Sequence, residues 1–249
     1  EAITSSQLEG ATTTRRVAQD MIRSKRDPRD KSERMILNNF LTMGHIAELK
    51  TKPLTPDIVL DIHRRITDQT LDADQAGRLR KSDEEVYVKN LERVVILHTP
   101  PSAKELSSRM KAMCDFANGS TPDEFLHPAL RSMILHFWLA YDHPFVDGNG
   151  RTARALFYWS MLRHGYWLFE FVSISRILHN SPAKYGLAFL YTETDENDLT
   201  YFLLHQLSVI EQAINDLNTY IETKSREMQA LEKKLRVLED LNHRQRALI

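Results

Sequence analysis

The chain has 249 residues, of which 42% are hydrophobic and 27% charged, as in one large globular domain or one domain with an appendage. Its 33 lysines and arginines and 34 aspartates and glutamates give a net charge of −1, which argues against a general nucleic-acid coat and a polybasic membrane-binding protein. A single cysteine, Cys114, excludes an internal disulfide and a cysteine-rich zinc module. We expect it to be a small buried side chain in a protein of a reducing, cytoplasmic setting.

Few turns are encoded, since there are 8 glycines and 9 prolines, which disfavours a many-stranded sandwich or barrel. We therefore predict an all-α fold with one small β-hairpin and a C-terminal helical arm. The longest mostly apolar stretch, 133–141, is too short to span a bilayer, which takes about 20 residues, so no membrane partner is expected. The chain opens at Glu1 without a methionine and stops at Ile249 within a repeating pattern, so we expect further residues beyond both ends.

Hydrophobic periodicity and capping residues predict the helices in chain order. Pro56 and Pro128 stand at early helical positions, where the missing N–H costs nothing, and Ser102 can cap a helix. The helix after Pro128 is apolar on most faces and is expected at the centre of the fold. Helices are predicted near residues 5–10, from 32 to 49, from 56 to 66, from 102 to about 116, from 128 to 143 and from 151 to 165.

Residues 85–99 follow a different pattern. Val86 and Val88 alternate with polar neighbours, and the apolar run 94–97 follows after a short polar segment. This pattern predicts one β-hairpin over 85–98, which Pro100 and the residue after it would end.

The C-terminal region carries a heptad seam. Apolar residues fall at alternating steps of four and three, with Lys224 as the lapse, at 203, 207, 210, 214, 217, 221, 228, 231, 235 and 238. One straight helix over this region would be about 55 Å long. Two alternatives stay open, namely two or more helices folded back on the core, or an arm that forms a homodimer. We divide the chain into an N-terminal segment, a core and an arm, at residues 1–31, 32–205 and 206–249.

The loop HPFVDGNGRTAR, residues 143–154, lies between two apolar helices and combines residues suited to phosphate chemistry. Gly148 and Gly150 let successive N–H groups turn inward as an anion-binding nest, which leads directly into a helix N-terminus. Arg151 and Arg154 lie three residues apart on the first turn of that helix and add two guanidinium groups. This combination predicts a polyphosphate site.

Two further residues of the loop indicate a reaction. Asp147 is an unusual neighbour for phosphate unless a hard cation such as Mg²⁺ lies between them. His143 titrates near neutrality and can take a proton from an incoming hydroxyl. A structural role is the commoner explanation for any one of these residues, but together they predict phosphoryl or nucleotidyl transfer. His127, His136 and His143 lack the spacing of a zinc site, so ordinary packed or polar roles are expected for the first two.

The loop resembles HPFxDGNGRxxR, the signature of the Fic (filamentation induced by cAMP) family, and matches every fixed position of it. The resemblance extends over roughly residues 1–205. It implies a mostly helical protein adenylyltransferase, which uses Mg-ATP to transfer AMP onto a Ser, Thr or Tyr hydroxyl of a target protein. The cofactor and the substrate implied are thus Mg²⁺ and ATP.

The resemblance also implies a role for each residue of the site. His143 would be the general base, Asp147 would hold Mg²⁺, and the polyphosphate would be bound by Gly148, Asn149, Gly150, Arg151 and Arg154. Phe145 would anchor the loop in the core. The hairpin at 85–98 would be the flap that aligns a target segment by strand addition. Tyr185 is a candidate for the adenosine pocket, with an ordinary core tyrosine as an equal alternative.

Residues 5–10, SSQLEG, resemble the inhibitory motif [ST]xxxE[GN] of the Fic subgroup that carries an inhibitory helix ahead of its core. Ser5 and Glu9 would share one face of a helix. The resemblance implies that Glu9 pairs with Arg154, which removes a cation that the nucleotide needs and obstructs the position of the ATP γ-phosphate. In some relatives the same glutamate assists removal of AMP, so a reverse activity is a further implication.

Two rival functions are weighed against AMP transfer. Doc-like relatives are kinases that transfer the γ-phosphate, and they carry a lysine where this chain has Gly150, so the intact glycine favours AMP transfer. The second rival is a non-enzymatic DNA-linked regulator or toxin–antitoxin component. Residues 242–246, NHRQR, would open a winged-helix module beyond Ile249, and nucleic acid is expected as a partner only through such a module.

Overall fold

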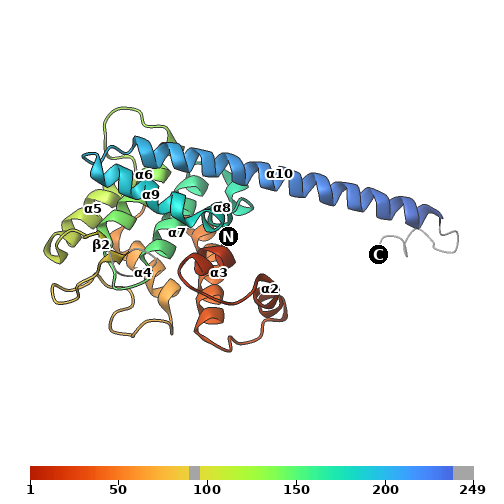
Figure 1. Ribbon diagram of the computed structural model, residues 1–249, viewed down its shortest axis with the longest axis horizontal. Coiled ribbons are helices and arrows are strands. Elements are labelled where there is room, and N and C mark those ends of the chain that lie inside the picture. The colour runs from red at the N-terminus through yellow and green to blue at the C-terminus, as the bar shows by residue number, and fades with distance from the viewer. Residues whose placement is uncertain (90–95, 238–249) are drawn as a thin grey trace.

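The computed structural model describes residues 1–89 and 96–237, and shows a helical body from which the last helix projects (Figure 1). The elements in chain order are α1 (Ala2–Leu8), α2 (Arg15–Ser24), α3 (Lys31–Leu49), α4 (Pro56–Thr67), β1 (Val88–Lys89), β2 (Ile96–His98), the 3-10 helix η1 (Ala103–Glu105), α5 (Leu106–Ala117), α6 (Pro128–Asp142), α7 (Asn149–Arg163), the 3-10 helix η2 (Trp167–Glu170), α8 (Ile174–Asn180), α9 (Pro182–Thr194) and α10 (Thr200–Val237). The predicted all-α fold class is confirmed.

Side-chain caps explain where the N-terminal helices begin. Thr14, Asp30 and Thr55 each accept the backbone N–H three residues further on, and Pro56 stands at the first turn of α4. The helices predicted from 32 and from 56 are therefore found within one residue of those starts. Helix α2 was not predicted, because the threonines before it are weak helix formers, although Thr14 is in fact its cap.

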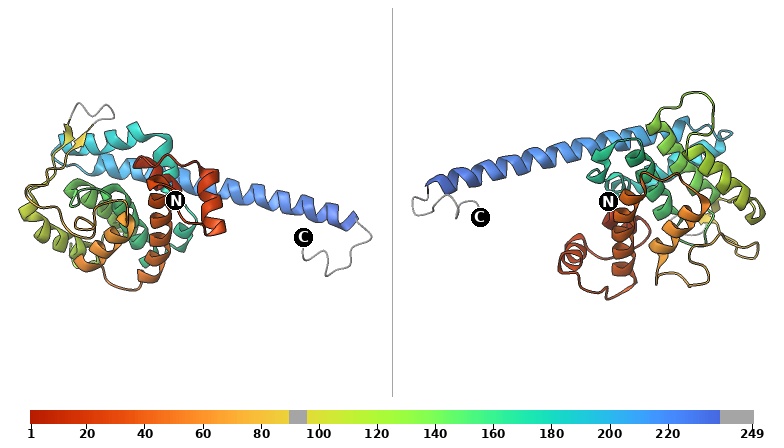
Figure 2. Two further views of the ribbon diagram at one scale, coloured as in Figure 1. Left: turned by 90° about the horizontal axis from the view of Figure 1, so that it is seen from below. Right: turned by 180° about the vertical axis from the view of Figure 1, so that it is seen from behind.

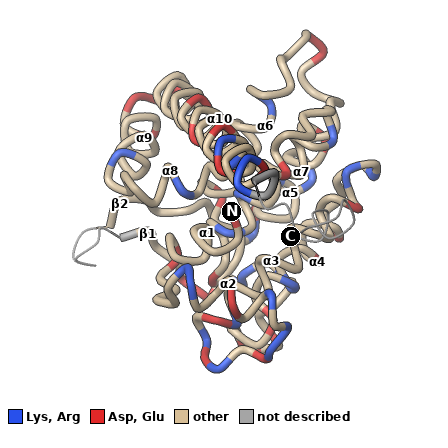
Figure 3. Tube along the Cα trace, turned by 90° about the vertical axis from the view of Figure 1, so that its right-hand side faces the viewer, with Lys and Arg blue, Asp and Glu red and all other residues tan. Residues whose placement is uncertain are grey.

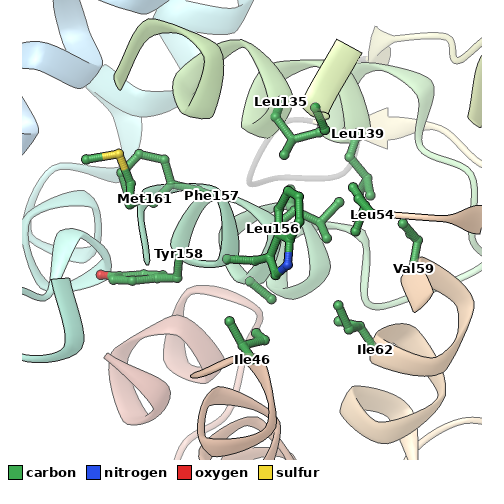
Figure 4. Packing of buried hydrophobic residues seen from close by; sticks show 14 of the residues in the cluster. Ile46, Leu54, Val59, Ile62, Leu135, Leu139, Leu156, Phe157, Tyr158 and Met161 are labelled. Carbon is green, nitrogen blue, oxygen red and sulfur yellow. The ribbon is translucent and has the colours of Figure 1, made fainter. Parts of the chain in front are cut away.

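Helices α6 and α7 pack against each other at the centre of the body, and the apolar character of α6 predicted this place for it. Helices α3 and α4 cover one side of α7, and Ile46, Val59 and Ile62 from them point toward Leu156 in the close-up of the core (Figure 4). Burial of such side chains stabilises the fold by roughly 1.5–3 kcal/mol each. The loop that joins α6 to α7 thus starts and ends in the most deeply buried helices of the described chain.

Strands β1 and β2 form an antiparallel pair, with Val88 opposite His98 and Lys89 opposite Ile96. They confirm the predicted hairpin, whose turn and whose predicted strand residues 94 and 95 lie outside the described residues. The pair lies on the side of the body away from the free end of α10 (Figure 2).

Helix α10 is one continuous helix of 38 residues, so the alternative of two or more helices folded back on the core is wrong. Val209 and Ala213, which lie beside the seam, are buried against the body, whereas the seam residues Ile221 and Met228 are 53% and 64% exposed. Figure 3 looks at the helix from its free end and shows acidic and basic residues around it. The proposed division between residues 205 and 206 falls within this helix, and seam position 238 lies outside the described residues.

Two expectations from composition can be compared with the described residues. Cys114 is buried, and burial raises the pKa of its thiol to about 12, which confirms the prediction of a small buried side chain. Within the ranges that the structure covers, no helix has both the length and the apolar character needed to cross a membrane.

Candidate active site

His143 follows the last residue of α6 and has left-handed backbone angles, φ 44° and ψ 55°. Its backbone N–H donates to Leu139 O, which closes the helix, and its Nδ1–H donates to Ala140 O at 3.2 Å. Because a carbonyl can only accept, Nδ1 carries the proton and Nε2 has a free lone pair in the neutral ring. Burial lowers the pKa of His143, so the ring is neutral near pH 7 and able to accept a proton.

The loop after His143 is held by its own side chains. Phe145 is fully buried, and the carboxamide of Asn149 donates to Phe145 O at 2.8 Å and accepts from Phe145 N–H at 2.9 Å. Asn149 therefore closes the loop with its side chain. A contribution from Asn149 to phosphate binding would come from its backbone N–H.

Helix α7 begins with free N–H groups. Gly148 is its N-cap, with φ 82°, and has no side chain to cap the first turn. Within the described chain, the N–H groups of Asn149, Gly150 and Arg151 have no hydrogen-bond acceptor. Unpaired N–H groups at the positive end of a helix dipole form a ready anion site.

The two arginines of the loop differ in their partners. Arg151 is buried and donates from Nη1 to Ile66 O at 3.2 Å, while its buried Nε and Nη2 have no hydrogen-bond partner among the described residues. Arg154 is also buried, and it donates from Nε to Ser5 Oγ at 2.8 Å and from Nη2 to Glu9 Oε1 at 2.8 Å. A buried guanidinium with unpaired N–H groups needs an anion, and Arg151 has the donors for one.

Helix α1 and its C-cap residue place Ser5 and Glu9 together on Arg154. The Glu9 carboxylate also lies over the first turn of α7, so close that a Cβ built on Gly150 would overlap its Oε1 atom. Burial lowers the pKa of the Arg154 guanidinium, but the charge and hydrogen bond of Glu9, together with the charges of Tyr185 and Glu1, raise it by more in total, and the net shift is upward. Glu9 thus provides the anion for one of the two arginines.

Asp147 is the candidate metal ligand of the loop. Its carboxylate is 47% exposed. Oδ1 accepts a hydrogen bond from Gly148 N–H at 2.6 Å, and Oδ2 lies 3.7 Å from Arg151 Nη2. The part of the chain that the structure describes holds no cluster of three or more His, Cys, Asp or Glu residues that could bind a metal by itself. A single accessible carboxylate beside a phosphate site fits Mg²⁺, which usually binds one or two carboxylates together with substrate phosphates.

Comparison with known proteins agrees with this geometry. Residues 53–161 match the model of the Fic/DOC family. This stretch, which is less than half of the chain, is similar to the Fic/DOC family, and we refer to it as the Fic domain because of that similarity. Its loop at 143–154 and the preceding helices α4, α5 and α6 lie within or beside the matched stretch.

Sequence relatives of the Fic domain include proteins named "Protein adenylyltransferase Fic". The chain is 36% identical over 117 residues to that of Nematostella vectensis, which covers 47% of this chain and 25% of the relative. It is 35% identical over 133 residues to that of Drosophila melanogaster, which covers 53% of this chain and 25% of the relative. The chain therefore spans about a quarter of the length of these curated relatives.

Solved structures share the fold of the Fic domain. A Fic family protein from Desulfovibrio desulfuricans superposes with a TM-score of 0.73 at 22% identity, over 87% of this chain and 63% of that one. Fic-1 from C. elegans superposes with a TM-score of 0.61 at 23% identity, over 87% of this chain and 62% of that one. These similarities confirm the mostly helical Fic fold.

Tyr185 lies on α9, beside the Fic-domain loop rather than in it. Its hydroxyl is 2.8 Å from His136 Nε2, its ring packs against Phe189, and burial raises its pKa to about 12. These are the contacts of a packed core tyrosine. A role for Tyr185 in an adenosine pocket stays a prediction.

His63 on α4 was not predicted as a site residue, although it is bound to the loop. Gly77 N–H donates to its Nδ1 at 2.9 Å, and its Nε2–H donates to Asp147 O at 2.9 Å. Its ring stacks on Phe145 with centroids 3.7 Å apart and planes 8° apart. One histidine on an amphipathic helix gives no signal in a sequence, because its partners come from segments far along the chain.

Two more contacts of the Fic domain escaped prediction for the same reason. Arg80 donates from Nε to His143 O at 3.0 Å and from its backbone N–H to Pro144 O at 2.9 Å. His98 on β2 donates from Nε2 to Tyr141 O and from Nδ1 to Glu193, both at 2.6 Å. The hairpin is thereby connected to the end of α6 just ahead of the loop.

Proposed function

We propose that this Fic domain is a protein adenylyltransferase, which transfers AMP from Mg-ATP to a Ser, Thr or Tyr hydroxyl of a target protein. The observation that carries the proposal is the loop between α6 and α7. It combines a neutral histidine that has a free lone pair, unpaired N–H groups at a helix N-terminus, and a buried guanidinium with unpaired N–H groups. The names of the curated relatives support it.

In the reaction, the N–H groups of residues 149–151 and the Arg151 guanidinium bind and orient the polyphosphate. Nε2 of His143 accepts the proton of the target hydroxyl as its oxygen forms a bond to the α-phosphorus. The bond from the α-phosphorus to the bridging oxygen breaks, and pyrophosphate leaves. Positioning and charge neutralisation by preorganised donors supply most of the rate in such transfers.

Asp147 would hold Mg²⁺ through the carboxylate that is exposed at the edge of the loop. The cation supplies neutralisation of the polyphosphate charge when it is bound. Arg151 completes this side of the site, because its Nη2 lies 3.7 Å from the same carboxylate.

The hairpin β1–β2 is our proposed docking edge for the target. An exposed strand edge can pair with an extended segment of almost any sequence through backbone hydrogen bonds. The contact from His98 to Tyr141 O ties this edge to the residue two positions ahead of His143. A target segment paired there would be placed at a set distance from the general base.

Glu9 is our proposed inhibitor of the site. Its carboxylate occupies one guanidinium, that of Arg154, and lies over the first turn of α7 where a phosphate would bind. Removal of the carboxylate would free a charge-assisted contact of about 1.5–3 kcal/mol, or about 10- to 100-fold in nucleotide affinity. The same carboxylate, placed beside the phosphate site, is our candidate assistant for removal of AMP.

The test uses ATP labelled at the α-phosphate and, in parallel, at the γ-phosphate. We expect α-label on protein with the Glu9→Gly variant, more than with the wild type, and loss of about 10²- to 10⁴-fold when His143→Ala is added. Gln7→Gly is the matched control, since it places the same glycine two residues away on α1, where Gln7 bonds to Thr13 O rather than to Arg154. Label from the γ-phosphate alone would show a kinase and contradict AMP transfer.

The remaining parts of the proposal concern the setting of the protein. The exposed apolar seam of α10, with Ile221 and Met228, supports a homodimer formed through the arm. A cytoplasmic location would give the enzyme access to ATP. The free thiol of Cys114 is in keeping with such a reducing setting.

A further inference from the structure

The peptide between Asp147 and Gly148 lies directly ahead of the N-terminus of α7, where the proposed phosphate site begins. In a planar trans peptide, the C=O and N–H groups point to opposite sides. The carbonyl of Asp147 points to His63 on α4, so the N–H of Gly148 points away from α4. That N–H meets Asp147 Oδ1 at 2.6 Å, on the side where the Asp147 carboxylate lies beside Arg151.

The reverse orientation would damage the site. Rotation of this peptide would turn the Asp147 carbonyl toward the Arg151 side and would break the bond from Gly148 N–H to the Asp147 carboxylate. A carbonyl oxygen carries partial negative charge and would repel a phosphate. The reverse orientation would therefore weaken the attraction that the free N–H groups and Arg151 exert on a polyphosphate.

Gly148 leaves the peptide free to rotate. A glycine is necessary here, because its φ is 82° and a Cβ would lie 2.8 Å from Thr67 Cγ2. Glycine adopts positive and negative φ about equally well, so its own sterics do not choose between the two orientations. The choice comes from the groups that bond to this peptide, which are His63 at its carbonyl and the Asp147 carboxylate at its N–H, and of these two the buried ring of His63 comes from a separate element.

We propose that His63 is a positioning residue that locks the Asp147–Gly148 peptide, with its N–H and not its carbonyl directed to the phosphate site. This inference rests on the proposed function, since the lock matters for a bound polyphosphate. His63 touches neither substrate nor the reacting atoms, and acts through the backbone of the loop.

His63 is itself held in one tautomer and one orientation. Gly77 N–H can only donate, so Nδ1 of His63 accepts and Nε2 carries the proton. The ring is fully buried and is stacked on Phe145.

A matched pair of variants separates the lock from mere packing. His63→Gln can keep an N–H donor near the Nε2 position, whereas His63→Asn can keep an acceptor for Gly77 N–H but cannot reach Asp147 O. Both are made in the Glu9→Gly protein, in which the nucleotide site is open. We expect the Asn variant to raise the KM for ATP about tenfold or more, and the Gln variant to rescue most of this loss.

Thermal midpoints of the two variants control for stability, because each loses the same ring and the same stacking. Equal KM values at equal midpoints would overturn the inference. So would a crystal structure of the Asn variant in which the Asp147 carbonyl still points to α4. In the parent protein, nitrogen NMR of labelled histidine should show His63 protonated at Nε2, and protonation at Nδ1 would also contradict the lock.

The two proposals fail in different ways. Absence of AMP transfer by the Glu9→Gly parent would remove the proposed function. The tautomer of His63 and the peptide orientation in the two variants would still test the lock without any measurement of activity.

Discussion

The loop at 143–154 and the outer part of α10, residues 218–237, are held in place by opposite means. The loop is bonded to residues as far away in sequence as His63 and Ile66, which lie 84 and 85 positions from their partners. The outer part of α10 depends on the hydrogen bonds of its own helix, and Met228 on its seam is 64% exposed. The geometry of the site is thus a property of the whole core, whereas the arm is available for contacts that the body does not use.

The largest expected effect is a loss of stability when the packing of the loop is removed, and it tests the contrast between the loop and the arm. Phe145→Ala removes a fully buried ring and its stacking on His63, so we expect the free energy of unfolding to fall by about 3–5 kcal/mol. Met228→Ala, the matched loss on the arm, should change it by less than about 0.5 kcal/mol. Chemical denaturation of both variants measures the difference. Similar losses would mean that the arm is packed as tightly as the loop.

A second prediction concerns the stability of the core at low pH. Burial, together with the charges of Arg154 and His205, lowers the pKa of His136 to about 3. The unfolded chain binds this proton below about pH 6.5 and the folded chain does not, so stability is present above that pH and is lost as the pH falls toward 3.

Denaturation at several pH values measures this loss, for which we expect a slope of up to about 1.4 kcal/mol per pH unit. His136→Gln should flatten the slope, since glutamine does not titrate. An unchanged slope in that variant would place the acid sensitivity elsewhere, and would remove His136 from the list of groups that set it.

The smallest expected effect on stability comes from a charge placed on the exposed seam of the arm. Ile221→Asp puts a charge on the exposed seam, where Ile221 is 53% exposed, and should leave the stability of the core within about 0.5 kcal/mol. The same variant should shift a dimer toward the monomer, as light scattering after gel filtration would show. A wild-type protein that is already monomeric would contradict dimerisation through the seam.

The two regions also differ in what could be predicted from the sequence. The loop was predictable because its functional groups are contiguous, and their roles depend on local features such as glycine and a helix N-terminus. Its supports were not, since His63, Arg80 and His98 reach it from other elements. On the arm, periodicity predicted a seam, but it could not decide between one helix and several, because that depends on contacts with the body.

Helix α1 likewise has one contact that follows from a local motif and another that could not be read from the sequence. The motif at residues 5–10 predicted that Ser5 and Glu9 share a face, and the structure places both on Arg154. The anchor at the other end of α1 was not predicted. There the Glu1 carboxylate accepts bonds from Tyr158 OH and Ser175 N–H, which attach α1 to α7 and α8.

The close approach of Glu9 to Gly150 restricts how such a domain can change its chemistry. Doc-like kinases carry a lysine at this position, and any side chain there would collide with the Glu9 carboxylate in the present arrangement. A lysine there would therefore require the Glu9 carboxylate to move from its present position on Arg154. The residue at position 150 and the contact between α1 and α7 are thus coupled, and a change in one constrains the other.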